Sequence, residues 1–233
     1  MADEDVKIIS SGGLRAVIGE LAGAFERTSG IKLTTIFNPP AAVKRRVEGG
    51  EDVDVVVLST TLIDELIGGG KLVAASRTEV ARSGLGVAVR RGAAKPDIST
   101  AEAFKQTLLD AKSIVCSDPA GGAASGIHFQ KVIERLGIAK EVMARARLNS
   151  GSFNAEIVAR GEAELAVQQI SEIVPVEGAE LVGPFPPGIQ VMTVFAAATT
   201  AVSRQPAAAK QLIAFLTSPT AAKVITASGM EAG

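Results

Sequence analysis

The chain has 233 residues, 47% of them apolar, and a formal net charge of −1. This length is enough for one large domain or for two smaller lobes with cores of their own. Because Lys and Arg (24) balance Asp and Glu (25), the composition predicts no nucleic-acid partner. The chain has eight Phe but no Trp or Tyr, which argues against a site that stacks sugars or bases on aromatic rings.

The cysteine and histidine content limits the chemistry further. The single cysteine, Cys116, excludes an internal disulfide, and the single histidine, His128, excludes a multi-histidine metal site. We therefore expect neither a metal nor a cofactor. No apolar run approaches the length of a membrane span, so we expect no membrane insertion. The first residues, MADEDVKIIS, carry no export signal, which leaves a cytoplasmic protein or a mature periplasmic one whose signal peptide has been removed.

The first third of the chain repeats one pattern three times: a strand, a short polar loop and a helix. The strands are predicted at 6–10, 31–37 and 53–59. The helices are predicted at 14–25, after Asn38-Pro39-Pro40 with Asn38 as the cap, and from Thr60 or Thr61 to the glycines at 68–70. Strand 53–59 is almost entirely apolar, as expected where helices cover both faces of a sheet. The pattern predicts an α/β lobe with a mostly parallel sheet.

The middle of the chain lies between two strands of alternating pattern, SGLGVAVRRG at 83–92 and GIQVMTVFAAAT at 188–199. Between them we expect a helix capped by Ser99 and Glu102, a strand at 113–117 followed by a helix, a helix opened by Ser152, and a strand at 164–168. Two helices end the chain. We expect the alternating strands to form a two-segment hinge, with a middle lobe at 84–194, an outer lobe made of 1–83 and 195–233, and a ligand cleft between the lobes.

Small polar loops at strand ends are candidates for holding an anion. In open α/β sheets ligands bind at the carboxyl ends of the strands, where helix N-termini offer unpaired N–H groups and the positive end of the helix dipole. In the outer lobe the candidates are Ser10, Ser11, Gly12, Gly13, Asn38 and Ser59. In the middle lobe they are Ala124, Ser125 and Ser152. The alternative is that each polar side chain only caps its own helix.

Motifs along almost the full length resemble type 2 periplasmic binding proteins, and specifically the molybdate-binding proteins of ABC importers. They are FERTSGIKL, VEGGEDVDVVVLS, SDPAGGAASGIHFQKVIERLGI, GEAELAVQQISEI and AFLTSPTAAKVITASGM. The resemblance implies a two-lobed α/β fold, each lobe a sheet flanked by helices, that closes on a small anion. It also implies a periplasmic monomer that delivers its ligand to the membrane subunits of an ABC importer.

The same resemblance implies positions for the ligand donors. The molybdate-binding set has a serine in each of the first two loops, backbone amides in the third and a tyrosine after a late strand. These positions fall on Gly13, near Pro39-Pro40, on Ala124-Ser125 and Phe153, and on Gln169. Three of the departures remove hydroxyl donors that a bare tetrahedral oxyanion needs, so we expect an organic carboxylate rather than molybdate. Donors suited to carboxylates are available from Arg15, Lys44 and Gln168.

Two functions stay open at this point. The one we favour is a solute-binding protein that hands a small anion to an importer. The sequence also resembles aconitate isomerases of the same fold, which implies a proton shift between the cis and trans forms of an unsaturated tricarboxylate. Such a shift needs a base, and His128 is the only histidine, with Glu172 and Asp118 as alternatives. A lone histidine on a helix is more often structural than catalytic.

Overall fold

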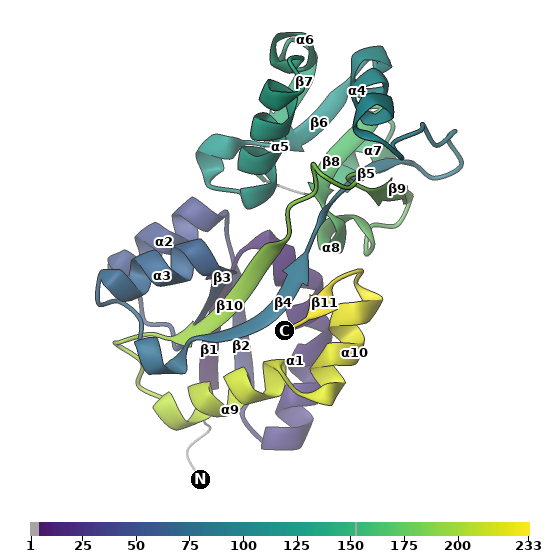
Figure 1. The fold of residues 1–233 in the computed structure, drawn as a ribbon. Helices are drawn as coiled ribbons and strands as arrows, with labels where there is room; N and C mark the ends of the chain where they lie inside the picture. Colours follow the sequence, from purple (N-terminus) through teal and green to yellow (C-terminus); the bar gives the residue numbers. More distant parts are fainter. Residues whose placement is uncertain (1–4, 152) are drawn as a thin grey trace. The chain divides into compact units, whose positions relative to one another are not determined.

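The computed structural model describes residues 5–151 and 153–233. The chain divides into two compact units: a first unit, Met1–Arg82 with Thr193–Gly233, and a second unit, Ser83–Met192. The second unit is therefore one continuous insertion in the chain of the first, and its elements run from blue-teal to green in Figure 1. The ligand cleft stays a prediction.

The first unit is built on a six-stranded sheet with the order β11-β4-β10-β3-β1-β2. Its strands are β1 (Asp5–Ser10), β2 (Lys32–Phe37), β3 (Val55–Ser59), β4 (Thr78–Ser83), β10 (Thr193–Thr199) and β11 (Glu231–Ala232). Its helices are α1 (Arg15–Ser29), α2 (Pro40–Glu48), α3 (Thr60–Gly68), α9 (Pro206–Leu216) and α10 (Pro219–Ala227), with 3-10 helices at Gly12–Leu14 and Ala74–Ser76. Strand β1 is parallel to β2 and β3, whereas β10 is antiparallel to β3.

Side-chain alternation along β1 divides the core of the first unit into two layers. Ile8 belongs to the layer that α1, α9 and α10 cover, together with Leu21 and Leu212. Ile9 points to the other face, where it joins Val43 of α2 and Ile63 of α3. Full burial of one such side chain stabilises the fold by about 1.5–3 kcal/mol. Packing on both faces therefore holds the parallel strands, and the loops at their ends, in fixed positions.

The second unit has a five-stranded sheet with the order β7-β6-β8-β5-β9. Its strands are β5 (Leu85–Arg90), β6 (Ile114–Ser117), β7 (Ala146–Asn149), β8 (Leu165–Gln169) and β9 (Ala179–Pro184). Its helices are α4 (Ala101–Asp110), α5 (Ala124–Arg135), α6 (Ala139–Met143), α7 (Asn154–Ala159) and α8 (Ile170–Ile173), with a 3-10 helix at Pro119–Gly121. Strand β6 is parallel to β7 and β8, and β5 is antiparallel to β8 and β9.

The α/β class with one sheet in each unit is confirmed, but both sheets are mixed rather than mostly parallel. The expected strand at 188–199 begins only at Thr193. The expected alternation of strand 84–90 is not seen in its burial, because β5 is buried at every position except Arg90. Val87 packs into one core layer and Ala88 into the other, so helices cover both faces of this strand.

Two expected helix caps are wrong. Pro39, not Asn38, is the N-cap of α2, because the Asn38 side-chain oxygen instead accepts a hydrogen bond from Arg46. Helix α4 is capped by Thr100, whose hydroxyl oxygen accepts from the Ala103 N–H at 3.1 Å, and not by Ser99. The helix that Ser152 was expected to open begins at Asn154, and Ser152 itself lies outside the described residues.

Candidate functional site

The carboxyl ends of the parallel strands in the first unit lie together at one edge of its sheet. Ser10, at the end of β1, is opposite Phe37 of β2, and β3 continues alongside to Ser59. The chain leaves each strand here and enters α1, α2 or α3. No described side chain caps the start of these helices. Their first N–H groups, and the positive ends of their dipoles, therefore lie beside the loops that follow the strands.

Two serines follow each other at the end of β1, and only the first has a hydroxyl that is hydrogen-bonded within the described residues. Ser10 is fully buried, and its hydroxyl donates to the Ser11 carbonyl at 3.2 Å. The Ser11 side chain is 5% exposed and makes no hydrogen bond to any described residue. Since every buried side-chain polar atom among the described residues has a partner, the Ser11 hydroxyl reaches solvent. Its hydrogen is available to a ligand oxygen.

Gly13 lies against the ring of Phe195, the third residue of β10. A Cβ atom added at Gly13 would stand 2.5 Å from the Phe195 Cζ and 2.8 Å from Cε1. Carbon atoms in contact prefer about 3.5–4.0 Å. Glycine is therefore required at this position, and the ring excludes the serine that the molybdate-binding set would have there. Gly12 precedes it in the same 3-10 turn.

The other candidate residues of the first unit differ in the residues that they contact. The Arg15 guanidinium lies over the Phe37 ring, 5.4 Å from its centroid, on the exposed side of the first loop. Ser59 is the half-buried N-cap of α3, and no described residue hydrogen-bonds to its hydroxyl. Asn38 is held by Arg46. The Lys44 ammonium is 2.6 Å from Glu65, and this hydrogen bond raises the pKa of Lys44.

A hydrogen-bonded cluster lies at the carboxyl-end edge of the second sheet, where the parallel strands β6, β7 and β8 end. The Ser125 hydroxyl is 3.1 Å from the Ser117 hydroxyl at the end of β6. The Asn154 side-chain nitrogen donates to Ser117 at 3.3 Å and to the Val167 carbonyl of β8 at 2.9 Å. Its oxygen accepts from the Asn149 amide at the end of β7, also at 2.9 Å. One buried side chain, Asn154, thus connects all three strand ends.

The remaining second-unit candidates surround this cluster. Ala124 is the first residue of α5, which no described side chain caps. Gln168 is 3% exposed, and its side-chain oxygen accepts from the Ala155 N–H at 3.3 Å. Gln169 is 4% exposed and ends β8, and Phe153 is the N-cap of α7. The predicted second-unit residues that are described therefore gather at one sheet edge, apart from His128.

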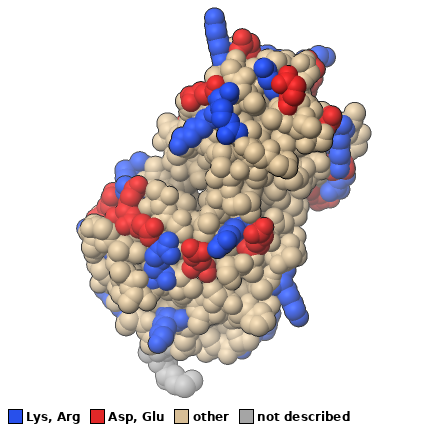
Figure 2. All heavy atoms as spheres, viewed as in Figure 1, with Lys and Arg blue, Asp and Glu red and all other residues tan. Residues whose placement is uncertain are grey.

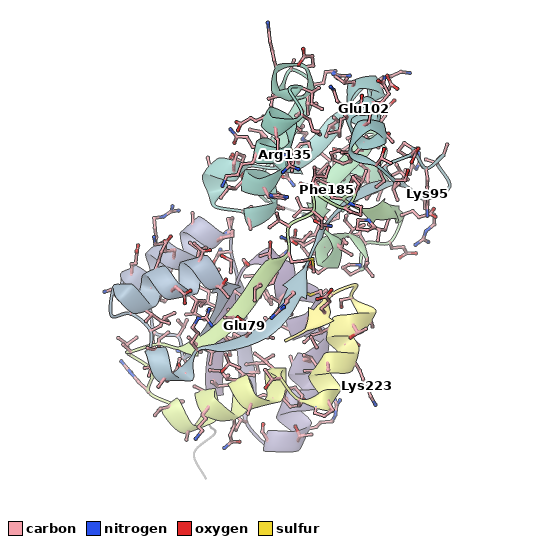
Figure 3. All side chains as sticks on the ribbon, in the orientation of Figure 1. Glu79, Lys95, Glu102, Arg135, Phe185 and Lys223 are labelled. Atoms are coloured by element: carbon pink, nitrogen blue, oxygen red, sulfur yellow. The ribbon has the colours of Figure 1, made fainter. Side chains whose placement is uncertain are left out.

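His128 lies in the second turn of α5 and is tied to the segment that follows β9. Its Nε2 is 3.0 Å from the Ile189 carbonyl oxygen, which can only accept, so Nε2 carries the hydrogen. Seven residues further along the same helix, Arg135, labelled in Figure 3, donates to the Gly188 carbonyl at 2.6 Å. Both side chains fasten one backbone segment to α5. Only Nδ1 of His128 is left as a proton acceptor.

The two other candidate bases differ in their surroundings. Both carboxylate oxygens of Asp118 accept hydrogen bonds, from the Ala120 N–H at 2.9 Å and the Ser150 hydroxyl at 3.1 Å. Glu172 is half-buried in α8, directly after the end of β8.

Among the described residues, neither Cys116 nor the charged surface side chains form a second candidate site. Burial, with Asp118 nearby, raises the pKa of the Cys116 thiol to about 11, so it stays a neutral, unreactive thiol. No group of three potential metal ligands occurs in the described part of the chain. On the face in Figure 2, acidic and basic side chains are interspersed. Several of the charged residues form ion pairs, among them Arg77 with Asp64 and Glu79. Among the described residues, no helix is long and apolar enough to cross a membrane.

Sequence reasoning missed three residues of these edges: Ser117, Asn154 and Phe195. Ser117 ends a parallel strand just as Ser10 and Ser59 do, so the rule that found those residues could have found it. Asn154 and Phe195 act through contacts with residues distant in the sequence, and no local pattern marks such contacts.

Comparison with known proteins gives the chain its relatives. An aconitate isomerase from a Pseudomonas species is 38% identical over 230 residues, which cover 96% of this chain and 86% of that protein. The periplasmic molybdate-binding protein of Azotobacter vinelandii has a similar structure, with a TM-score of 0.82 and 22% identity over 97% of this chain and 98% of that one. The structure of a sulfate-binding protein of Mycobacterium tuberculosis is also similar, with a TM-score of 0.78 and 17% identity over 97% of this chain and 86% of that one. Residues 6–231 match the family model of bacterial extracellular solute-binding proteins. The chain therefore belongs to the bacterial extracellular solute-binding protein family.

Proposed function

We propose that the protein binds a small polycarboxylate of the aconitate class. The observation that carries the proposal is the 38% identity, over 96% of the chain, with an aconitate isomerase. Aconitate has three carboxylates on a short carbon chain, so its recognition needs several separate donors rather than one compact oxyanion pocket. The donor types at the two edges agree with this requirement.

The first-unit edge supplies donors of two kinds. The hydroxyls of Ser11 and Ser59 have no partner among the described residues, and the guanidinium of Arg15 is exposed over Phe37. A guanidinium can donate two parallel hydrogen bonds to one carboxylate, which an isolated hydroxyl cannot. Phe195 excludes a hydroxyl-bearing side chain at Gly13, which weakens the case for molybdate.

The second-unit edge adds hydroxyl and amide donors. They come from Ser125 and Ser117, from the first N–H groups of α5, and from the side chains of Gln168 and Gln169. Desolvating a carboxylate without replacing its hydrogen bonds costs several kcal/mol. We further propose that the protein works in the periplasm as a carrier for an ABC importer, in line with its family.

The second candidate function is isomerisation of aconitate, which the same relative favours. An allylic proton shift needs a base beside the carbon that loses the proton, and donors for the enolate-like charge that develops on the adjacent carboxylate. The candidate bases are the Nδ1 of His128, Glu172 and Asp118. The serine and amide donors of the second unit would stabilise the developing charge.

One experiment tests binding and turnover together. The purified protein is mixed in heavy water with cis-aconitate, trans-aconitate, citrate, tricarballylate, sulfate and molybdate, one at a time, and followed by ¹H NMR. We expect line broadening or saturation transfer with the tricarboxylates and much weaker effects with the two inorganic anions. Deuterium incorporation with conversion of one aconitate isomer into the other would establish the enzyme. Binding without exchange would leave the carrier, and tight binding of molybdate alone would overturn the proposal.

A further inference from the structure

We propose that Asn154 is a positioning residue that makes the Ser117–Ser125 hydroxyl pair present one hydrogen to an oxygen of the bound anion. The inference rests on the proposed function, because it concerns the same edge of the second sheet. It adds a residue, and a direction of hydrogen bonding, that neither the sequence nor the relatives indicate.

The orientation of the Asn154 amide is fixed by its neighbours. The Val167 carbonyl, 2.9 Å from the side-chain nitrogen, can only accept, so the NH₂ group must face it. The side-chain oxygen accepts from the Asn149 amide at 2.9 Å on the other side. Asn154 is 1% exposed, which leaves no space for water to replace either bond. The second N–H of the amide therefore donates to the Ser117 hydroxyl at 3.3 Å.

Counting the hydroxyl hydrogens of Ser117 and Ser125 shows how many of them have no acceptor in the described part of the chain. Two hydroxyls bring two hydrogens, and one of these bridges Ser117 and Ser125 across 3.1 Å. The amide of Asn154 is a donor toward Ser117 and cannot accept the other. No other described residue accepts a hydrogen bond from either hydroxyl. The pair therefore holds one unused hydrogen in a site where the two serines are 8% and 4% exposed. A negatively charged oxygen is the acceptor that satisfies this donor best.

The packing of α5 keeps the pair together. A Cβ atom at Gly126 would stand 2.3 Å from the Ser117 carbonyl oxygen, so glycine lets the first turn of α5 lie directly on the end of β6. This close approach brings Ser125, the residue before Gly126, within hydrogen-bonding distance of Ser117. The first N–H groups of α5 lie beside it. The unused hydrogen and these N–H groups form one set of donors.

The test replaces Asn154 by a side chain of the same shape that accepts instead of donating. In Asn154→Asp a carboxylate oxygen can take the hydrogen of Ser117, and Ser125 then donates to Ser117, so neither hydrogen is left for the ligand. Affinity for tricarballylate, a saturated tricarboxylate that cannot undergo the allylic shift, is measured by calorimetry. We expect the dissociation constant to rise about 10- to 100-fold, as for loss of a hydrogen bond to a charged oxygen.

A double-mutant cycle separates positioning from a general loss of stability. Because Ser125 donates to Ser117, the unused hydrogen is that of Ser117. Ser117→Ala is therefore expected to weaken binding in the wild-type background and to cause a much smaller further loss in the Asn154→Asp background, where this hydrogen is already consumed. The matched control is Thr200→Val in the first unit, which removes another buried hydroxyl, bonded to the Val53 carbonyl. It should lower the melting temperature but leave the affinity unchanged.

Each outcome has a defined meaning. Unchanged affinity in Asn154→Asp, or additive effects of the two substitutions, would overturn the positioning role while leaving the proposed function intact. No binding of any carboxylate by the wild type would overturn the proposed function and the inference with it. If Asn154→Asp does not fold, Ser117→Ala decides: we expect at least a fivefold loss of affinity, with a lower melting temperature because the Asn154 N–H loses its acceptor. Unchanged affinity in Ser117→Ala would overturn the inference.

Discussion

The contact of Gly13 with the Phe195 ring predicts a position at which one methyl group destabilises the first unit. In Gly13→Ala the new Cβ would stand 2.5 Å from Cζ of the ring, about 1 Å inside normal contact. Phe195 is 4% exposed and packs in the core layer that α1 and α9 cover, so the ring has little space to withdraw. Overpacking of this kind costs about 1–3 kcal/mol. For a chain of this length each kcal/mol lowers the melting temperature by about 2–4 °C.

The matched control is another glycine of the same region. Gly19, within α1, has no atom within 4 Å of its added Cβ. Gly19→Ala should therefore stabilise the protein by about 0.5–1 kcal/mol, because alanine loses less conformational freedom in a helix. Thermal unfolding followed by circular dichroism measures both variants. Adding Phe195→Leu to Gly13→Ala should recover part of the loss, so that the two substitutions together cost less than their sum. A Gly13→Ala protein as stable as Gly19→Ala would refute the reasoning.

Two further predictions follow from the second unit. Burial raises the pKa of the Cys116 thiol to about 11 and so favours the neutral form. We expect about 3 kcal/mol of stability to be present below pH 9 and lost as the pH rises from 9 to 11. Chemical denaturation of Cys116→Ala should lack this loss. In His128→Gln the new amide can still donate to the Ile189 carbonyl, so the melting temperature should change by only a few degrees. If Nδ1 is the base, any isomerase activity should fall about 100- to 10,000-fold. Activity that survives this change would assign the base to Glu172 or Asp118 instead.

Local sequence patterns were enough for the strands and for the edges on which the candidate donors lie. The apolar run VVVLS predicts β3 because a strand covered on both faces has no polar side, and the loop after it contains Ser59. The same reasoning predicts β1 and the loop with Ser11. Carboxyl ends of adjacent parallel strands share an edge, so the sequence alone predicts both hydroxyls at one edge of the sheet.

Contacts between distant residues decide what the local patterns leave open. Asn38 has the right type and position for a cap, but Arg46, two turns into the next helix, takes its oxygen. Nothing near Gly13 in the sequence indicates that an aromatic ring from β10 will lie on it. Asn154 follows an expected ligand position, yet its importance comes from the ends of three strands that meet around it. Propensity and periodicity carry no information on such pairings.

A carrier and an isomerase need the same hydrogen-bond donors for the ligand, and the isomerase needs a catalytic base as well. Each edge has O–H and N–H donors, which are the groups that the proposed binding of a polycarboxylate requires whether or not the ligand reacts. Turnover also requires a base that is free to take a proton. Asp118 accepts hydrogen bonds on both carboxylate oxygens and holds its own loop, and His128 uses Nε2 to hold the segment after β9. Each would act as a base only through the acceptor capacity that these bonds leave. A substitution that removes the base should therefore abolish any turnover and leave ligand binding intact.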